Sequence, residues 1–337
     1  MSFRLRNPLT NVSFKRNRIP LLGGEKIKII KTFQIQRYIP ILDLKNGSFI
    51  IGCSELTGRR WKGAVQFFKS GTKIKSAFTS KNAIRLSSST NDGCFVGTSD
   101  KILTGDDTGV ITLWSQAKHP PYNWIECITV HQHDDIVMGI ECLVPEETYV
   151  TVGADGHIKL YDVLEMICVR NYESAHQNII CNVTVKPNST TVMATGSYDR
   201  TICLWDENVV KPVQTVLKSD CAIRCVKWLN ENTLVYGNDA GVLSTVDVRN
   251  PSTTTLIANL PAPIHRIIVK PEENHVAVCG DNRKVSVYDV SGTKSQLLYE
   301  NNKLHSNFVR GLAWDVNNSD ALTSVGWDSA VKTHKYK

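Results

Sequence analysis

The sequence predicts an all-β fold in which one small antiparallel unit is repeated along the chain. The unit is clearest between His176 and Asp206, where turn residues separate three short apolar strands, Ile179–Val185, Thr191–Gly196 and Thr201–Trp205. The ends of the third strands recur every 41 to 47 residues, by subtraction between Phe68, Trp114, Tyr161, Trp205, Val246, Tyr288 and His334. This spacing is typical of blades of about 40–45 residues. Seven units therefore predict a seven-bladed β-propeller.

Most units also repeat parts of a polar frame. In the clearest unit His176 precedes the first strand, Asp199 lies in the turn before the third strand, and Trp205 and Asp206 end that strand. This frame is the signature of a WD-repeat blade, in which a Ser or Thr of the middle strand completes a hydrogen-bonded chain. Its role is structural, because buried indole and imidazole nitrogens need partners. The predicted structural residues are His133, Asp155, His176, Asp199, Trp205, Asp206, Asp239, Asp281, His305 and Asp328.

The last unit ends at Lys332–Tyr336, only three strands into its blade. Near the N-terminus, Lys26–Ile35 alternates apolar and polar residues well enough for a strand. We expect this strand, at about residues 26–35, to complete the last blade and close the ring, because it would cover an open sheet edge. Residues 25–337 then form a single propeller domain, and residues 1–24 form a basic, flexible arm.

Composition limits the classes of protein to consider. The 337 residues carry a net charge of +7, and no apolar run reaches the roughly 18 residues that a membrane span needs. Met1–Arg18 has no apolar signal-peptide core, and the ten cysteines include no Cys-x-x-Cys pair. We therefore expect reduced thiols and a cytoplasmic and nuclear location, with no membrane association.

No motif indicates an enzyme or a cofactor. The stretch His131-Gln-His-Asp-Asp135 has side chains that suit a metal, but His133 occupies the position of His176 in its own unit. Gly105-Asp-Asp-Thr-Gly109 is a blade turn, because no lysine-bearing helix follows it. We expect no catalytic residue, no metal site and no cofactor.

The first unit departs from the pattern in one place. A long loop, Gly52–Gly63, replaces the short turn between its second and third strands and lacks the structural Asp. It carries Arg59, Arg60, Trp61 and Lys62. A Trp at a glycine-flanked loop tip is costly to expose, so it predicts an anchor that enters a partner's pocket. The alternative is a Trp that folds back on its own blade.

At this loop the sequence resembles the methylosome WD-repeat proteins, the propeller cofactors of the type II protein arginine methyltransferase. The resemblance rests on Gly52–Gly63, on His133-Asp-Asp-Ile-Val137, and on Phe308–Trp314 with Thr323–Asp328. The basic N-terminal leader departs from the Pro-rich, less basic start of that family, which leaves the role of the arm open.

The resemblance implies a non-catalytic subunit that binds the N-terminal barrel domain of the methyltransferase. Assemblies of the family contain four copies of each subunit, and they present Arg-rich substrates, including histone tails and spliceosomal Sm proteins. Carried over by position, Trp61 becomes the inserted anchor and Arg59 the cation that faces the partner. Arg60 and Lys62 lie beside them in the partner-binding loop, and Gly58 and Gly63 become its flexible flanks.

Two other interaction functions stay open. Substrate receptors of cullin-type ubiquitin ligases often carry an Arg two residues after the blade-closing Asp, and Val246-Asp-Val-Arg249 matches in part. The +7 charge alone would also suit a basic histone- or RNA-binding propeller. Direct nucleic-acid binding is not expected, because no aromatic residues alternate with the N-terminal charges as they do in a single-strand groove.

Overall fold

The computed structural model describes residues 42–45, 48–57, 60–68, 83–98, 100–119, 123–314 and 321–336. All of them lie in one compact unit, Gln34–Lys337. In these ranges the chain forms strands and one short 3-10 turn, Pro271–Glu273. No helix there is long and apolar enough to cross a membrane.

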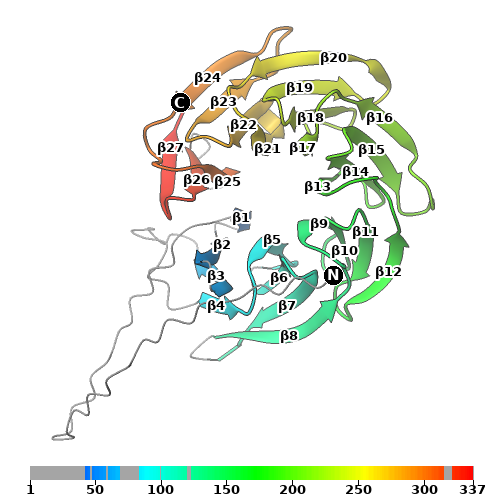
Figure 1. Cartoon of the computed structure of the whole chain (residues 1–337), viewed down its shortest axis with the longest axis vertical. Coiled ribbons are helices and arrows are strands. Elements are labelled where there is room, and N and C mark those ends of the chain that lie inside the picture. Colours follow the sequence, from blue (N-terminus) through cyan, green and yellow to red (C-terminus); the bar gives the residue numbers. More distant parts are fainter. Residues whose placement is uncertain are drawn as a thin grey trace, which may run out of the picture. The chain divides into compact units, whose positions relative to one another are not determined.

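The strands form antiparallel meanders that follow one another around a ring (Figure 1). The first blade contains β1 (Leu42–Lys45), β2 (Ser48–Thr57), β3 (Arg60–Phe68) and β4 (Ala83–Leu86). The second contains β5 (Thr90–Phe95), β6 (Lys101–Asp106), β7 (Val110–Gln116) and β8 (Trp124–His131). The third contains β9 (Val137–Val144), β10 (Thr148–Gly153), β11 (Ile158–Asp162) and β12 (Ile167–Tyr172). The fourth contains β13 (Ile180–Val185), β14 (Val192–Ser197), β15 (Thr201–Asp206) and β16 (Gln214–Lys218).

The remaining blades continue the same order. The fifth contains β17 (Ile223–Trp228), β18 (Thr233–Asn238), β19 (Val242–Asp247) and β20 (Asn250–Asn259). The sixth contains β21 (Ile264–Lys270), β22 (His275–Gly280), β23 (Val285–Asp289) and β24 (Gln296–Asn301). The seventh contains β25 (Val309–Trp314), β26 (Ala321–Gly326) and β27 (Val331–Lys335). The predicted seven-bladed propeller is therefore confirmed, and each predicted third-strand position lies in the third strand of its blade.

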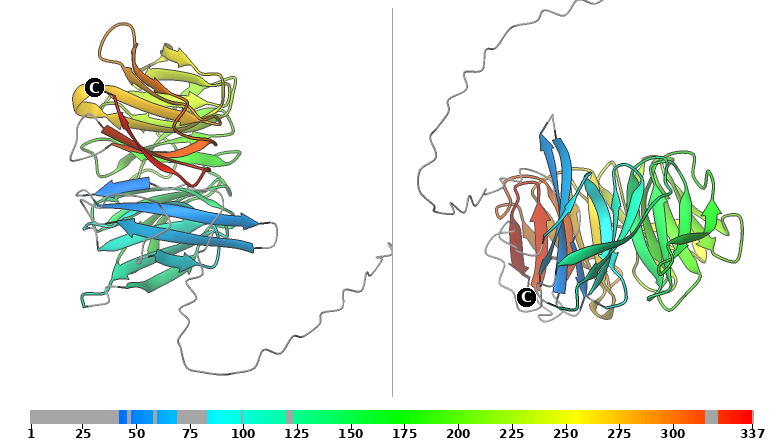
Figure 2. Two further views of the ribbon diagram at one scale, coloured as in Figure 1. Left: turned by 90° about the vertical axis from the view of Figure 1, so that its left-hand side faces the viewer. Right: turned by 90° about the horizontal axis from the view of Figure 1, so that it is seen from below.

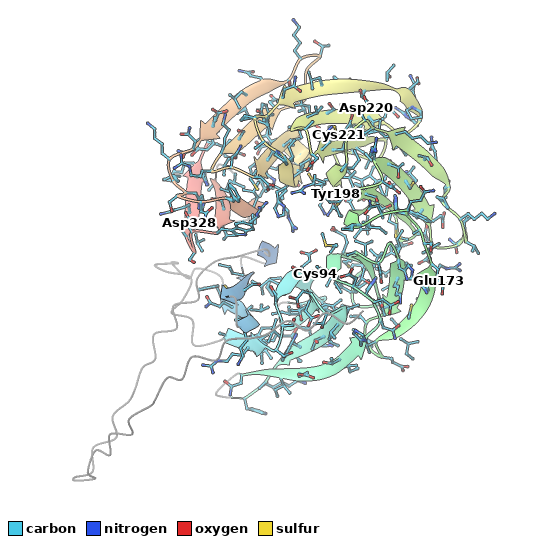
Figure 3. All side chains as sticks on the ribbon, viewed as in Figure 1. Cys94, Glu173, Tyr198, Asp220, Cys221 and Asp328 are labelled. Atoms are coloured by element: carbon cyan, nitrogen blue, oxygen red, sulfur yellow. The ribbon has the colours of Figure 1, made fainter. Side chains whose placement is uncertain are left out.

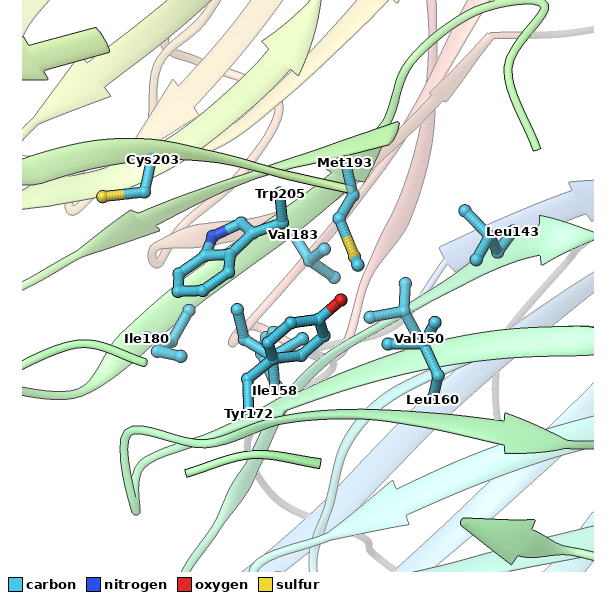
Figure 4. Packing of buried hydrophobic residues seen from close by; sticks show 11 residues of the cluster. Leu143, Val150, Ile158, Leu160, Tyr172, Ile180, Val183, Met193, Cys203 and Trp205 are labelled. Atoms are coloured by element: carbon cyan, nitrogen blue, oxygen red, sulfur yellow. The ribbon is translucent and has the colours of Figure 1, made fainter. Parts of the chain in front are cut away.

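The apolar core lies between neighbouring blades. One cluster packs Leu143, Val150, Ile158, Leu160 and Tyr172 of the third blade against Ile180, Val183, Met193 and Trp205 of the fourth (Figure 4). Because both faces of a middle strand are covered by adjacent blades, β10 and β14 are almost fully buried along their length.

The first strand of every blade stands at the centre of the ring, where it contacts the first strand of the next blade. The ring closes where β1 of the first blade lies against β25 of the last. Tyr198 and Cys94 lie near this centre, whereas Glu173 lies at the periphery (Figure 3). The described part of the last blade has three strands. The strand predicted at residues 26–35, and the boundary predicted after residue 24, lie outside the described residues.

Candidate functional site

The first blade carries a hairpin that is longer than its own sheet. Strands β2 and β3 pair in continuous register from Phe49 opposite Phe68 to Thr57 opposite Arg60. However, β1 pairs only with residues 48–51 of β2, and β4 pairs only with residues 63–66 of β3. Residues 55–57 and 60–62 therefore form a two-stranded projection, which extends past the edge of the ring (Figure 2). We call this projection the blade-one hairpin.

The prediction of a long loop at residues 52–63 is wrong, because most of that segment is regular strand. Gly58 and Arg59 lie outside the described residues. Arg60 and Trp61 belong to β3, where the backbone of Trp61 lies opposite Leu56, and Lys62 is exposed. The glycines at both ends of the segment read as turn signals, but Gly52 lies inside β2 and Gly63 inside β3. Partner binding by residues 58–63 stays a prediction.

Gly63 is a packing residue and not the flexible flank that the resemblance implied. A Cβ added to Gly63 would stand 2.3 Å from the backbone oxygen of Ser88, at the approach to the second blade. The hydroxyl of buried Ser54 donates to the Thr90 carbonyl at 3.5 Å and accepts from Ser89 at 2.6 Å. The base of the blade-one hairpin is therefore held rigidly against the next blade. Ser54 was not among the predicted site residues; its signal in the sequence was a small polar residue directly after the buried run Ile50–Cys53.

The fourth blade contains the complete structural hydrogen-bond chain. His176 Nδ1 lies 2.8 Å from Asp199 Oδ2, and His176 Nε2 lies 2.7 Å from the hydroxyl of Thr195. The same hydroxyl accepts the indole N–H of Trp205 at 2.8 Å. Although burial alone would raise the pKa of Asp199, hydrogen bonds from His176 and Thr201 lower it. This geometry suits an Nδ1–H that donates to Asp199 and an Nε2 that accepts from the Thr195 hydroxyl.

Two other blades vary this chain. In the third blade His133 contacts Asp155 at 2.9 Å and Thr151 at 2.8 Å. Burial raises the pKa of Asp155, but the hydrogen bond and charge of His133, together with backbone N–H groups, lower it to about 2. In the seventh blade His305 contacts Asp328 at 3.0 Å and Ser324 at 2.7 Å.

The third strand of the seventh blade carries a histidine where the fourth blade has Trp205. His334 Nε2 lies 2.6 Å from the Ser324 hydroxyl, and its Nδ1 lies 3.0 Å from the Tyr299 hydroxyl. Its ring stacks on that of His305, with centroids 6.4 Å apart. The pKa of His334 is lowered to about 4, mainly because the ring is buried and also because it faces His305.

The other predicted structural aspartates have different partners. Asp239 lies 3.6 Å from Arg224, and Asp281 accepts hydrogen bonds from Arg224 and Arg310. Asp206 accepts the backbone and side-chain N–H groups of Asn208 and so shapes the turn after β15.

Two further predictions concern exposed groups. His131 contacts the carbonyl of Thr108 at 2.8 Å, and in the described part of the chain no group of three or more His, Cys, Asp or Glu residues could hold a metal ion.

Arg249 is 67% exposed and forms a two-point contact with Asp247, at 3.0 and 2.7 Å. This contact pairs Arg249 with the aspartate that ends the third strand of its own blade.

Comparisons with known proteins identify the repeat and its relatives. The family model described as "WD domain, G-beta repeat" matches residues 125–162 and 166–206. The first match begins in the outer strand of the second blade and the second begins directly before the outer strand of the third blade; each ends in the third strand of the next blade.

The methylosome protein WDR77 of Xenopus laevis is 24% identical to this chain, and the match covers 86% of each of the two chains. WD repeat-containing protein 37 of Xenopus laevis is also 24% identical, over 58% of this chain and 40% of its own length. A WD repeat-containing protein 53 homolog of Dictyostelium discoideum is 24% identical over 43% of this chain. Among these three relatives, only the methylosome protein is matched over most of its length.

Proposed function

Because the chain is a WD-repeat β-propeller, we propose that it acts as a non-catalytic adaptor subunit of a methylosome. In this proposal it binds the type II protein arginine methyltransferase through the blade-one hairpin. The relative named as a methylosome protein supports the choice of partner, since the match covers most of both chains.

The observation that carries the proposal is the two-stranded projection of β2 and β3. Neither β1 nor β4 pairs with its distal residues, so both of its edges are free within the described sheet. A projecting hairpin that carries Arg60, Trp61 and Lys62 offers a partner backbone edges, cations and an aromatic anchor at one place. The anchored base at Ser54 and Gly63 limits the entropy that binding would cost.

The finer parts of the proposal follow the family resemblance. The partner surface is the N-terminal barrel domain of the methyltransferase, in an assembly with four copies of each subunit. The propeller helps to present Arg-rich substrates, such as histone tails and Sm proteins, for symmetric dimethylation in the cytoplasm and nucleus.

Co-purification of the propeller with the type II methyltransferase of the same organism tests the proposal. The variants are Trp61→Ala and, as a control outside the hairpin, Arg249→Ala. Truncating an aromatic anchor typically costs about 2–4 kcal/mol, or roughly 30- to 1000-fold in affinity. We expect Trp61→Ala to lose the complex while its Tm stays at the wild-type value, and Arg249→Ala to bind as the wild type does.

Equal binding by wild type and Trp61→Ala would show that the hairpin is not the anchor. If wild type itself fails to bind, the methyltransferase is the wrong partner. Loss of a ligase-adaptor complex in Arg249→Ala would then favour the ubiquitin-ligase receptor function instead.

A further inference from the structure

The first strands of five blades surround a polar chamber in the central channel. In each of these strands the residue that follows the first buried position points into the channel; these residues are Asn91, Met138, Cys181, Arg224 and His265. The chamber is also lined by Asn182, Tyr198, Lys227 and Arg266. The chamber has a volume of about 190 Å³, room for several water-sized groups.

The described lining of this chamber is cationic. It contains Arg224, Lys227 and Arg266, together with the donor groups of Asn91 and Tyr198, and it contains no carboxylate. The three cationic side chains are 18 to 26% exposed, so the chamber is open to solvent. The sixth equivalent position is Arg310, whose charge also acts on His265.

The acidic partners of these cations lie outside the chamber. Arg266 lies 3.7 Å from Asp92 and Lys227 lies 2.5 Å from Glu141, both across the channel and towards its other mouth. Arg224 lies 3.3 Å from Asp281 in the turn of the sixth blade and 3.6 Å from Asp239, and it also donates to the Tyr198 hydroxyl. Each of the three cations therefore has an acidic partner outside the chamber.

Two further observations indicate an acceptor at the centre. In the described structure Asn91 Nδ2 and Arg266 Nε are buried donors without a hydrogen-bond partner. Such groups are costly to leave unpaired. The pKa of His265 is lowered well below its usual value, first by burial and then by the nearby charges of Arg310, Arg224 and Arg266. An anion between these groups would accept hydrogen bonds from the unpaired donors and would offset the positive charges around His265.

We propose that this chamber binds a single phosphate group, either free or as the monoester of a small molecule. Phosphate presents several acceptor oxygens, and donors here converge from β5, β17 and β21. Arginine guanidinium groups bind phosphate by two parallel hydrogen bonds, which a halide ion cannot accept. The site is separate from the blade-one hairpin and does not depend on the partner proposed for it.

Thermal melts and calorimetric titration of the full chain test the proposal, at constant ionic strength. The probes are inorganic phosphate and glycerol 3-phosphate, with chloride as the reference. We expect each to raise the Tm relative to chloride, because a ligand that binds only the folded state stabilises it. Tighter binding of the ester would place the rest of its molecule in the channel, and tighter binding of phosphate would identify the free ion as the ligand.

Arg224→Gln should weaken phosphate binding at least about tenfold, because it removes charge-assisted hydrogen bonds. His265→Glu should abolish binding by placing a carboxylate in the chamber. Arg249→Gln removes the same charge on the outer surface and should bind as the wild type does.

Absence of heat and of a Tm shift with both probes would overturn the proposal. Equal weakening in Arg224→Gln and Arg249→Gln would also overturn it, since the effect would then be one of net charge. If His265→Glu fails to fold, Asn91→Leu replaces it, with the same expected loss of affinity.

Discussion

His334 makes the seventh blade sensitive to pH in a way that can be isolated by one substitution. The imidazole is 1% exposed and lies between the hydroxyls of Ser324 and Tyr299, with His305 stacked on it. Tryptophan occupies the equivalent position in the fourth blade, where Trp205 donates to Thr195. His334→Trp therefore replaces a titratable group by one that suits the same hydrogen-bond chain.

The expected magnitude follows from the depressed pKa. In the folded state the pKa of His334 is about 4, against 6.5 for the free side chain, so the unfolded chain binds a proton first as the pH falls. Stability is then complete above pH 6.5 and is lost as the pH falls towards 4. The difference of about 2.5 units, at about 1.36 kcal/mol each, gives a loss of about 3 kcal/mol by pH 4, where native His334 is itself half protonated.

Urea denaturation at intervals between pH 7 and pH 4 measures this loss. The pKa of His265 is also lowered, and the lowered pKa values of Asp155 and Asp328 make the protein less stable at still lower pH. The informative quantity is therefore the difference in unfolding free energy between wild type and His334→Trp. We expect the wild type to lose about 3 kcal/mol more than His334→Trp across this range. Overpacking by the larger ring would lower the unfolding free energy of the variant by the same amount at every pH. Parallel curves for the two proteins would refute the reasoning.

Three further predictions test the propeller itself. Thr195→Val leaves the Trp205 indole and the His176 imidazole without their partner, so urea denaturation should show a loss of about 2–4 kcal/mol; a loss below about 0.5 kcal/mol, as expected for exposed Thr254→Val, would contradict the structural role of the chain. Gly63→Ala forces its Cβ against the Ser88 carbonyl and should cost about 1–3 kcal/mol in the same assay; an unchanged midpoint would mean that the first blade yields there. Removing residues 1–36 should lower the Tm by more than about 5 °C, because β27 would lose its predicted partner strand. Removing only residues 1–24 is the control. An equal Tm for the two truncated proteins would show that residues 25–36 do not form the predicted strand.

Sequence spacing predicted the fold well because each blade repeats a strong local pattern. Trp205 and Asp206 mark the end of a third strand, and the spacing from them correctly placed weaker blades, such as the one whose third strand contains Val246. The His176–Asp199 frame was also readable, because a buried imidazole requires its partner at a fixed separation.

The candidate sites were harder to predict, because glycine and arginine have more than one role. Gly63 read as a turn residue, yet it is needed where β3 approaches the backbone of Ser88. The channel cations were missed because they are spread over three blades, and a search for local motifs does not compare equivalent positions. The register shared by Arg224, His265 and Arg310, each directly after a buried apolar residue, was the signal present in the sequence.

The blade-one hairpin belongs to the same sheet as the seam of the ring. Strand β1 lies against β25, where the first and last blades meet. It pairs with residues 48–51 of β2, and the far end of the same strand projects outwards in the hairpin. Opening the seam would tilt the first blade and displace the hairpin with it. A partner that binds the hairpin only in the closed ring would therefore also stabilise the contact between the first and last blades. Its binding free energy would add to the free energy needed to open the ring.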